Sequence, residues 1–310
     1  MRVANLLKTL VLFSLATLAL AACGAPAQPT PAVETVVMVV TATPEPLAQP
    51  TAEPAVQPTA EPAAQPTAEP AAQPTAEPSG GEYTGAVVQT NAEWTPVIEV
   101  IEGMQMALVP PGCFTMGNQA GTELEIPGHQ QCVNEPYWIG VTEVTNAQYG
   151  TDGDYGPDNF PRNQVTWVDA KTFCEGLGMR LPTEVEWEYA ARGPDSLTYP
   201  WGNDWVPGFS VNANNATLAA ATGTLPEGAS WVGALDMAGN LREWTFSVIK
   251  AYPYDGGDGR EDPRGEATTN RAVRGGSHMQ GRDQLRSSYR EWYQQGYTAA
   301  DIGFRCVKDY

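Results

Sequence analysis

Cysteine and histidine have the widest capacity for nucleophilic, redox and metal chemistry, and this chain has five cysteines and two histidines. Cys23 lies near the N-terminus, and the other four form an even set, as is typical of disulfide pairing in an oxidising compartment: Cys113, Cys132, Cys174 and Cys306. Three pairings of these four are possible. Because no CxxC unit occurs and neither His129 nor His278 has zinc-ligand spacing from a cysteine, a metal-thiolate site is the weaker interpretation.

Cys23 ends a short apolar segment that resembles a bacterial lipoprotein signal. Arg2 and Lys8 give a basic start, residues 9–22 are too short to span a bilayer, and the segment closes on Leu20-Ala21-Ala22-Cys23. We therefore expect residues 1–22 to be a cleaved signal and Cys23 to carry lipid on the extracytoplasmic face of a bacterial cell membrane. The alternative, an ordinary secretory signal, would leave a lone thiol outside the cell.

Residues 23–82 form a second segment with its own composition. An octad occurs four times from residue 49 onward, as QPTAEPAV, QPTAEPAA, QPTAEPAA and QPTAEPSG. Proline fixes φ and removes backbone donors, so polyproline II character should dominate and no core should form. At full extension this stalk would reach on the order of 170 Å. A solenoid is the weaker alternative, because the octad has no bulky apolar side chain to stack.

The remainder, residues 83–310, is long enough for one globular domain with a sizeable core and contains all nine tryptophans. Residues 1–82 hold seven Glu, one Arg and one Lys, which leaves 29 of the 36 acids and 15 of the 17 bases, a net charge of −14. This charge makes nucleic acid and anionic membrane surfaces poor partners for the domain.

Two segments of the domain are predicted to be helices. Thr166 can cap a helix over residues 167–177, and Thr183 with Glu186 forms the capping box of a second helix that Gly193 can end. Short strands are expected at residues 106–109, 137–141 and 272–274, joined by turns in a chain with 31 Gly and 27 Pro. The pattern predicts an irregular, loop-rich α+β fold.

From about Met104 to the C-terminus, the residues resemble the sulfatase-modifying-factor domain family, whose founding members are formylglycine-generating enzymes with a C-type-lectin-like fold. The motifs that carry the resemblance occur in the family's order: MALVPPGCFTMGN, YWIGVTEVTNAQY, VTWVDAKTFCEGLGMRLPTEVEWEYAARG, YPWGN, GALDMAGNLREW, VRGGS, LRSSYR and IGFRCV. The resemblance also implies a disulfide between Cys174 and Cys306, which leaves Cys113 to pair with Cys132.

The family's enzymes hold copper with two cysteines that follow the GGS motif, and they use oxygen to convert a target cysteine into formylglycine. In this chain Ser277 of the motif is kept, but the two cysteine positions hold Gln280 and Leu285, and Arg242 replaces a tryptophan. Cu(I) requires soft thiolates, so copper-dependent cysteine oxidation is expected to be lost. A two-histidine iron site is a weaker alternative, and His129 is expected to pack or cap near Cys132.

The resemblance also implies a structural calcium ion. Asp236 and Glu243 would supply carboxylate oxygens, and Gly239 and Leu241 would supply backbone carbonyls. The alternative is that Asp236 and Glu243 are solvated acids near a glycine turn.

Two classes of function compete: a lipid-anchored binding or scaffolding module, and an oxidoreductase of the formylglycine-generating type with an atypical site. The missing cysteines favour the first. The residues predicted to line a groove for an extracellular protein, peptide or glycan are His278, Gln280, Arg282, Tyr289 and Trp292, followed by residues 293–295. The alternative is that these side chains fill an irregular core.

Overall fold

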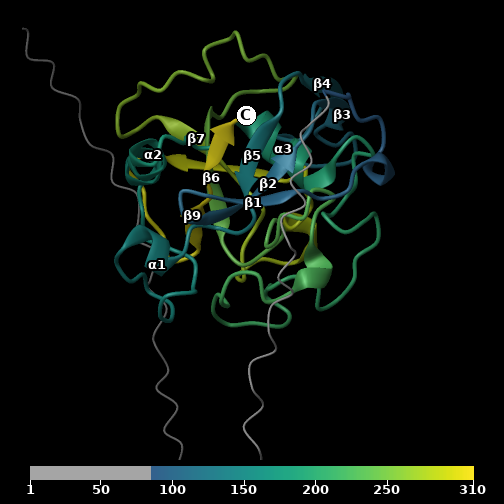
Figure 1. Ribbon diagram of the computed structural model, residues 1–310. Coiled ribbons are helices and arrows are strands. Elements are labelled where there is room, and N and C mark those ends of the chain that lie inside the picture. Colours follow the sequence, from purple (N-terminus) through teal and green to yellow (C-terminus); the bar gives the residue numbers. More distant parts are fainter. Residues whose placement is uncertain (1–84) are drawn as a thin grey trace, which may run out of the picture. The chain divides into compact units, whose positions relative to one another are not determined.

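The structure is a computed structural model that describes residues 85–310. The predicted signal, lipidated Cys23 and octad stalk lie outside the described residues. Two four-stranded sheets and a two-stranded hairpin organise the domain (Figure 1). The first sheet is antiparallel, with the order β1–β2–β5–β10; its strands are β1 (Ile98–Ile101), β2 (Met104–Val109), β5 (Tyr137–Gly140) and β10 (Val307–Asp309). The hairpin pairs β3 (Gly112–Met116) with β4 (His129–Val133).

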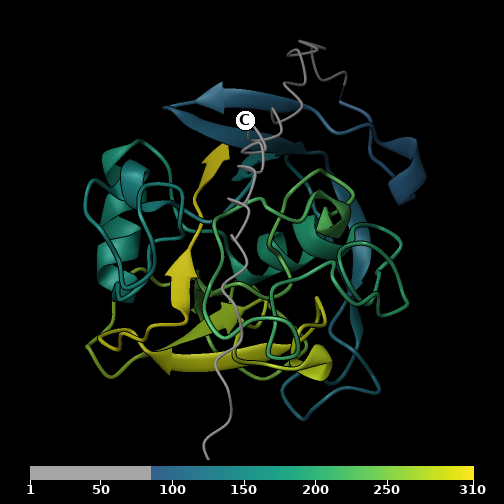
Figure 2. The same cartoon turned by 90° about the horizontal axis from the view of Figure 1, so that it is seen from below.

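The second sheet and the segments that adjoin its strands carry the residues that the family resemblance singles out for metal binding. Its order is β8–β7–β6–β9, and its strands are β6 (Arg242–Val248), β7 (Asn270–Arg274), β8 (Arg290–Gln294) and β9 (Ile302–Phe304). The pairing of β6 with β9 is parallel and the other two pairings are antiparallel. Figure 2 shows β1 and β2 on the opposite side of the domain from this sheet. Because β8 ends the order, one of its edges has no strand partner within the sheet.

Three α-helices flank the sheets: α1 (Asn146–Tyr149), α2 (Trp167–Gly176) and α3 (Glu184–Arg192). The predicted caps of the two longer helices are confirmed, because the hydroxyls of Thr166 and Thr183 accept N–H groups three residues on. Helix α2 packs on β6, whereas α3 contacts both the β3–β4 hairpin and β6–β7. Short 3₁₀ turns occupy Asn91–Glu93, Pro226–Gly228 and Arg282–Gln284. Within the described residues, no helix has the length and apolar content needed to cross a membrane.

Strand β2 shows why the first sheet lies inside the domain. Met106 and Leu108 enter one apolar cluster, while Ala107 and Val109 enter another. Successive strand residues point to opposite faces, so β2 is buried on both sides. The strands predicted at residues 106–109, 137–141 and 272–274 correspond to β2, β5 and β7, and the predicted α+β fold is confirmed.

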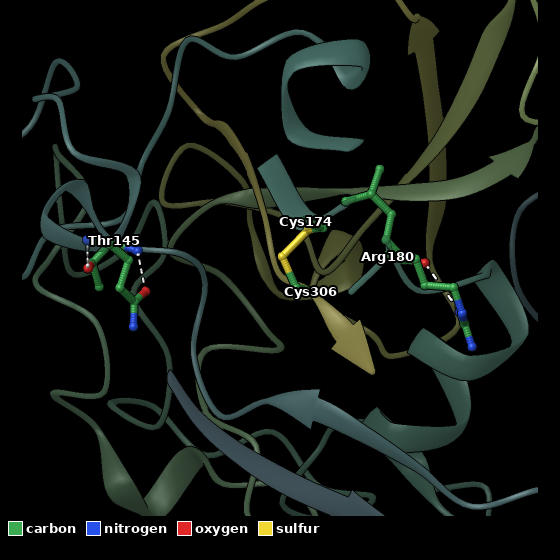
Figure 3. Close-up of a disulfide and its surroundings, with 6 residues drawn as sticks. Thr145, Cys174, Arg180 and Cys306 are labelled. Atoms are coloured by element: carbon green, nitrogen blue, oxygen red, sulfur yellow. Dashed lines mark hydrogen bonds between the residues drawn. A yellow bond between two sulfur atoms is a disulfide. The ribbon is translucent and has the colours of Figure 1, made fainter. Parts of the chain in front are cut away.

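Both predicted disulfides are confirmed. Cys113 and Cys132 face each other across the β3–β4 hairpin. Cys174 of α2 joins Cys306, which lies between β9 and β10, across 132 residues of sequence (Figure 3). In the chain-entropy model the longer closed loop constrains the unfolded chain more, so the second bond should contribute more to stability.

Charged side chains join α3 to the second sheet inside the core. Arg290 of β8 donates from Nε and Nη2 to the Glu184 carboxylate at 2.5 and 2.7 Å, and Arg274 of β7 donates to Glu188. Arg192 also reaches Glu188, at 2.8 Å. Burial alone would raise the pKa of Glu184, but Arg290 and Arg274 outweigh it and lower the pKa.

We predict that Glu184→Gln destabilises the domain by about 3 kcal/mol at neutral pH, because two buried guanidinium groups lose an anionic partner. A lowered carboxylate pKa stabilises the fold above the ordinary value of 4.5, and this contribution disappears as the pH falls through the folded-state pKa. The variant's unfolding free energy should therefore fall less than that of the wild type between pH values of about 5 and 3. Denaturant unfolding across this range provides the measurement.

The exposed Glu175 of α2, which pairs with Lys171 at 2.7 Å, offers a matched control. Glu175→Gln should change stability by less than about 0.5 kcal/mol. Equal losses in the two variants would contradict the argument from burial.

Candidate functional site

The positions equivalent to the family's copper site gather where β6 begins, β7 ends and β9 begins. Arg242 is the first residue of β6, Ser277 lies three residues beyond β7, and Asp301 directly precedes β9. Gly276 turns the chain between them with a φ of +69°, and a Cβ there would lie 2.7 Å from the carbonyl oxygen of Gln284. The turn therefore requires glycine.

Asp301 joins the two conserved-motif segments through its carboxylate. Ser277 Oγ donates to Oδ2 at 2.8 Å, and Arg242 Nη2 donates to Oδ1 at 2.5 Å. Arg242 also donates to the Tyr293 hydroxyl and to Glu291 Oε2, the latter at 3.3 Å. Burial opposes the charge of Arg242, but Asp301 outweighs it and raises the arginine pKa. Arg242, which stands where the family's enzymes have a tryptophan, therefore has its charge neutralised by Asp301.

The two positions that hold copper ligands in the enzymes have no free donor for a metal. The Gln280 amide donates to Glu291 Oε2 at 3.0 Å, and its oxygen accepts from the Ser277 N–H at 3.1 Å. Leu285 is fully buried. All four cysteines within residues 85–310 are in disulfides, so this region offers no thiolate. The residues present do not fit copper.

The structure corrects the prediction that His278 lines a groove. Its side chain is buried, with Nδ1 2.9 Å from the Asn240 carbonyl oxygen and Nε2 3.3 Å from the Tyr155 hydroxyl. His129 lies on β4 beside Tyr252, as expected, and Nε2 accepts the Tyr254 N–H at 2.8 Å. Each histidine is thus held by its own neighbours, and among the described residues no group of three His, Cys, Asp or Glu side chains could hold a metal ion.

The other residues predicted to line the groove do not lie together. Tyr289 and Trp292 line an open pocket beside β8, of about 470 Å³. Gln280 reaches Glu291, a residue of the same pocket, whereas Arg282 is exposed and pairs with Asp283. Of the residues that follow, Tyr293 lines the pocket and Gln295 is buried.

Sequence reasoning missed the acids that organise this region, Asp301 and Glu291. Glu291 accepts hydrogen bonds from Arg242, Gln280 and the Tyr289 hydroxyl. The available signal for Glu291 was its place in β8, where two charged residues precede two aromatic ones in the sequence REWYQ. For Asp301, the only signal in the sequence was its position directly before the IGFRCV motif.

The predicted calcium ligands are already engaged. Both oxygens of Glu243 accept from Arg305, at 2.6 and 2.7 Å, and one also accepts from the Trp187 indole at 2.8 Å. Asp236 accepts the Gly223 N–H at 2.6 Å and lies near the Glu143 carboxyl. Burial raises the pKa of both Asp236 and Glu143, and repulsion between the two acids raises that of Glu143 further. The carboxylates of Asp236 and Glu243 thus have protein partners, and calcium binding stays an untested prediction.

Residues 151–310, half of the chain, match the family model described as the sulfatase-modifying factor enzyme 1-like domain. The chain belongs to this family, with its C-type-lectin-like fold. Residues 45–80 match a second model, the PT disordered repeat.

Relatives of this chain include two kinds of enzyme, formylglycine-generating enzymes and a hercynine oxygenase. The formylglycine-generating enzyme of Mycobacterium tuberculosis is 35% identical over 190 residues, covering 52% of this chain and 62% of the relative. The formylglycine-generating enzyme of Thermomonospora curvata is 36% identical over 195 residues, covering 56% of this chain and 64% of the relative. The hercynine oxygenase of Mycolicibacterium thermoresistibile is 32% identical, covering 67% of this chain and 46% of the relative. The matches thus span less than two thirds of these relatives' length.

Two solved structures agree with the fold. PvdO from Pseudomonas aeruginosa superposes with a TM-score of 0.59 at 20% identity, covering 70% of this chain and all of that one. CarF superposes with a TM-score of 0.53 at 21% identity, covering 68% of this chain and all of that one.

Thermal unfolding in chelator and in millimolar calcium tests the calcium prediction. Because Arg305 and the Trp187 indole occupy Glu243, we expect the wild-type midpoint to be equal in both solutions. An ion that binds only the folded state must raise the midpoint with its concentration. A rise in the wild type that is absent from Asp236→Ala would establish the calcium site and contradict our expectation.

Proposed function

We propose that the chain is a lipid-anchored binding or scaffolding domain on the extracytoplasmic face of a bacterial cell membrane, without copper-dependent cysteine oxidase activity. The observation that carries this proposal is the state of the two copper positions. One holds an amide that bonds Glu291 and Ser277, and the other holds the fully buried Leu285. Neither side chain is a ligand for Cu(I), which favours thiolates.

The surroundings of these positions also support a binding role. Arg242 is held by Asp301, Glu291 and Tyr293, so a neutralised cation fills the place of the enzymes' indole. Redox chemistry would require this network to open. An open pocket beside the network, lined by aromatic and acidic residues, remains accessible to a ligand.

The second candidate is an oxidoreductase of the formylglycine-generating type with an atypical site. The GGS-motif Ser277, whose hydroxyl donates to Asp301, and the enzymes among the relatives favour it. It requires a metal ligand set other than two cysteines, and no such set is evident among residues 85–310.

The N-terminal segments supply the remaining part of the proposal. Lipid on Cys23 would hold the protein at the membrane, and the proline-rich residues 23–82 would carry the domain away from the surface. Partners would then be extracellular proteins, peptides or glycans.

We predict no conversion of cysteine to formylglycine in a sulfatase-type peptide, with or without copper. Mass spectrometry provides the measurement, because replacing CH₂SH by an aldehyde removes about 18 Da. Restoring both ligands with Gln280→Cys and Leu285→Cys should recover copper binding, while Arg242 still hinders turnover. A loss of about 18 Da after incubation with the unmodified protein would replace the binding proposal with the enzyme alternative.

Lipid attachment is tested separately by metabolic labelling with a fatty-acid analogue. The wild-type chain should incorporate label and fractionate with membranes, and Cys23→Ala should lose both properties because its acyl acceptor is gone. Label that persists unchanged in Cys23→Ala would show that the anchor assignment is wrong.

A further inference from the structure

The open pocket of about 470 Å³ runs along the free edge of β8. One wall consists of residues 122–124, and the other consists of the five consecutive residues 289–293. Successive side chains of a strand point to opposite faces, so a pocket that contacts five in a row follows the strand edge rather than one face. β8 is the edge strand of its sheet, which leaves this side open.

Aromatic rings supply much of the strand wall. Trp292, with 46% of its surface exposed, is the most exposed tryptophan among the described residues. Tyr289 and Tyr293 lie on either side of it in sequence. The Tyr293 ring already has the Arg242 guanidinium 4.7 Å from its centroid. The face of an indole attracts a cation more strongly than a phenol ring does.

Carboxylates give the pocket a negative charge. Glu123 is exposed and has no hydrogen-bond or ion-pair partner among residues 85–310. Glu291 shares Oε2 with Arg242 and Gln280, but Oε1 has only the Tyr289 hydroxyl, at 3.3 Å. Burial and the nearby Glu291 raise the pKa of Tyr289 to about 12, in agreement with this negative field.

The one cationic residue of the lining does not neutralise these acids. Arg290 is buried, where its guanidinium pairs with Glu184 and donates to the carbonyl oxygen of Leu124 at 2.7 Å. The charge of Arg290 is thus compensated by Glu184 on the core side. Its hydrogen bond to the Leu124 carbonyl oxygen holds residues 122–124, the opposite wall of the pocket, in place.

We propose that this pocket binds a guanidinium or alkylammonium group, held by the Glu123 carboxylate and by the face of the Trp292 indole, in a negative field to which Glu291 adds. The proposal specifies the ligand chemistry of the binding role proposed above and rests on it. An arginine or lysine side chain of a peptide and a free amine share this chemistry. The acidity of the whole domain would also favour the approach of such a cation.

Calorimetric titration of the full-length protein with arginine amide and with citrulline amide tests the proposal. Both probes carry an acetylated α-amino group, so they have nearly the same shape and only the arginine side chain carries a charge. We expect saturable binding of arginine amide, weakened at least tenfold in Trp292→Ala and several-fold in Glu123→Gln. Glu227→Gln removes an equally exposed acid outside the pocket and should bind like the wild type. Circular dichroism of each variant verifies that it is folded.

An arginine-containing tetrapeptide, compared with arginine amide, distinguishes the two sources of the cation. Tighter binding of the peptide, lost in Trp292→Ala, supports a peptide side chain, and equal binding supports a free amine. Equal affinity for arginine amide and citrulline amide, or binding of neither, would overturn the pocket assignment. Capture of an extracellular partner that is unchanged in Trp292→Ala would also overturn it, while leaving the broader binding proposal intact.

Discussion

The burial of two glutamates on α3 is the constraint that connects most of the described domain. Glu184 and Glu188 face a region from which water is excluded, and each is matched by an arginine from a different strand, Arg290 or Arg274. Removing one member of such a pair strands a buried charge, at a cost of about 3 to 5 kcal/mol. The helix and the two strands must therefore keep one mutual arrangement.

This arrangement also positions the functional region. Arg274 ends β7, directly before the glycine turn that presents Ser277, so the ion pair fixes the start of that turn. Arg290 begins β8 and holds the carbonyl oxygen of Leu124, which places one pocket wall against the other. A third buried pair, Glu243 with Arg305, joins β6 to the segment after β9 in the same way.

The same electrostatic rule separates this chain's candidate site from that of a copper enzyme. A metal site leaves donor atoms open toward the ion, whereas here Asp301, Glu291 and Glu243 are already occupied by arginines. Asp301 and Glu291, the acids next to the copper-equivalent positions, thus accept hydrogen bonds from Arg242 and Gln280. Glu123 lies outside this network, and its carboxylate has no partner among residues 85–310, so it adds negative charge to the pocket beside β8.

Local sequence determined the capping boxes of α2 and α3, the apolar strands β2 and β5, the family and the disulfide set, because each depends on short-range patterns or on ordered motifs. It did not reveal that Glu184 and Glu188 point inward, because an acidic helix face normally faces solvent and their arginine partners lie 106 and 86 residues away. For the same reason it placed His278 in a groove. Only tertiary structure brings Asn240 to His278 and Arg305 to Glu243, since the partner of a buried polar group is chosen by packing and not by spacing along the chain.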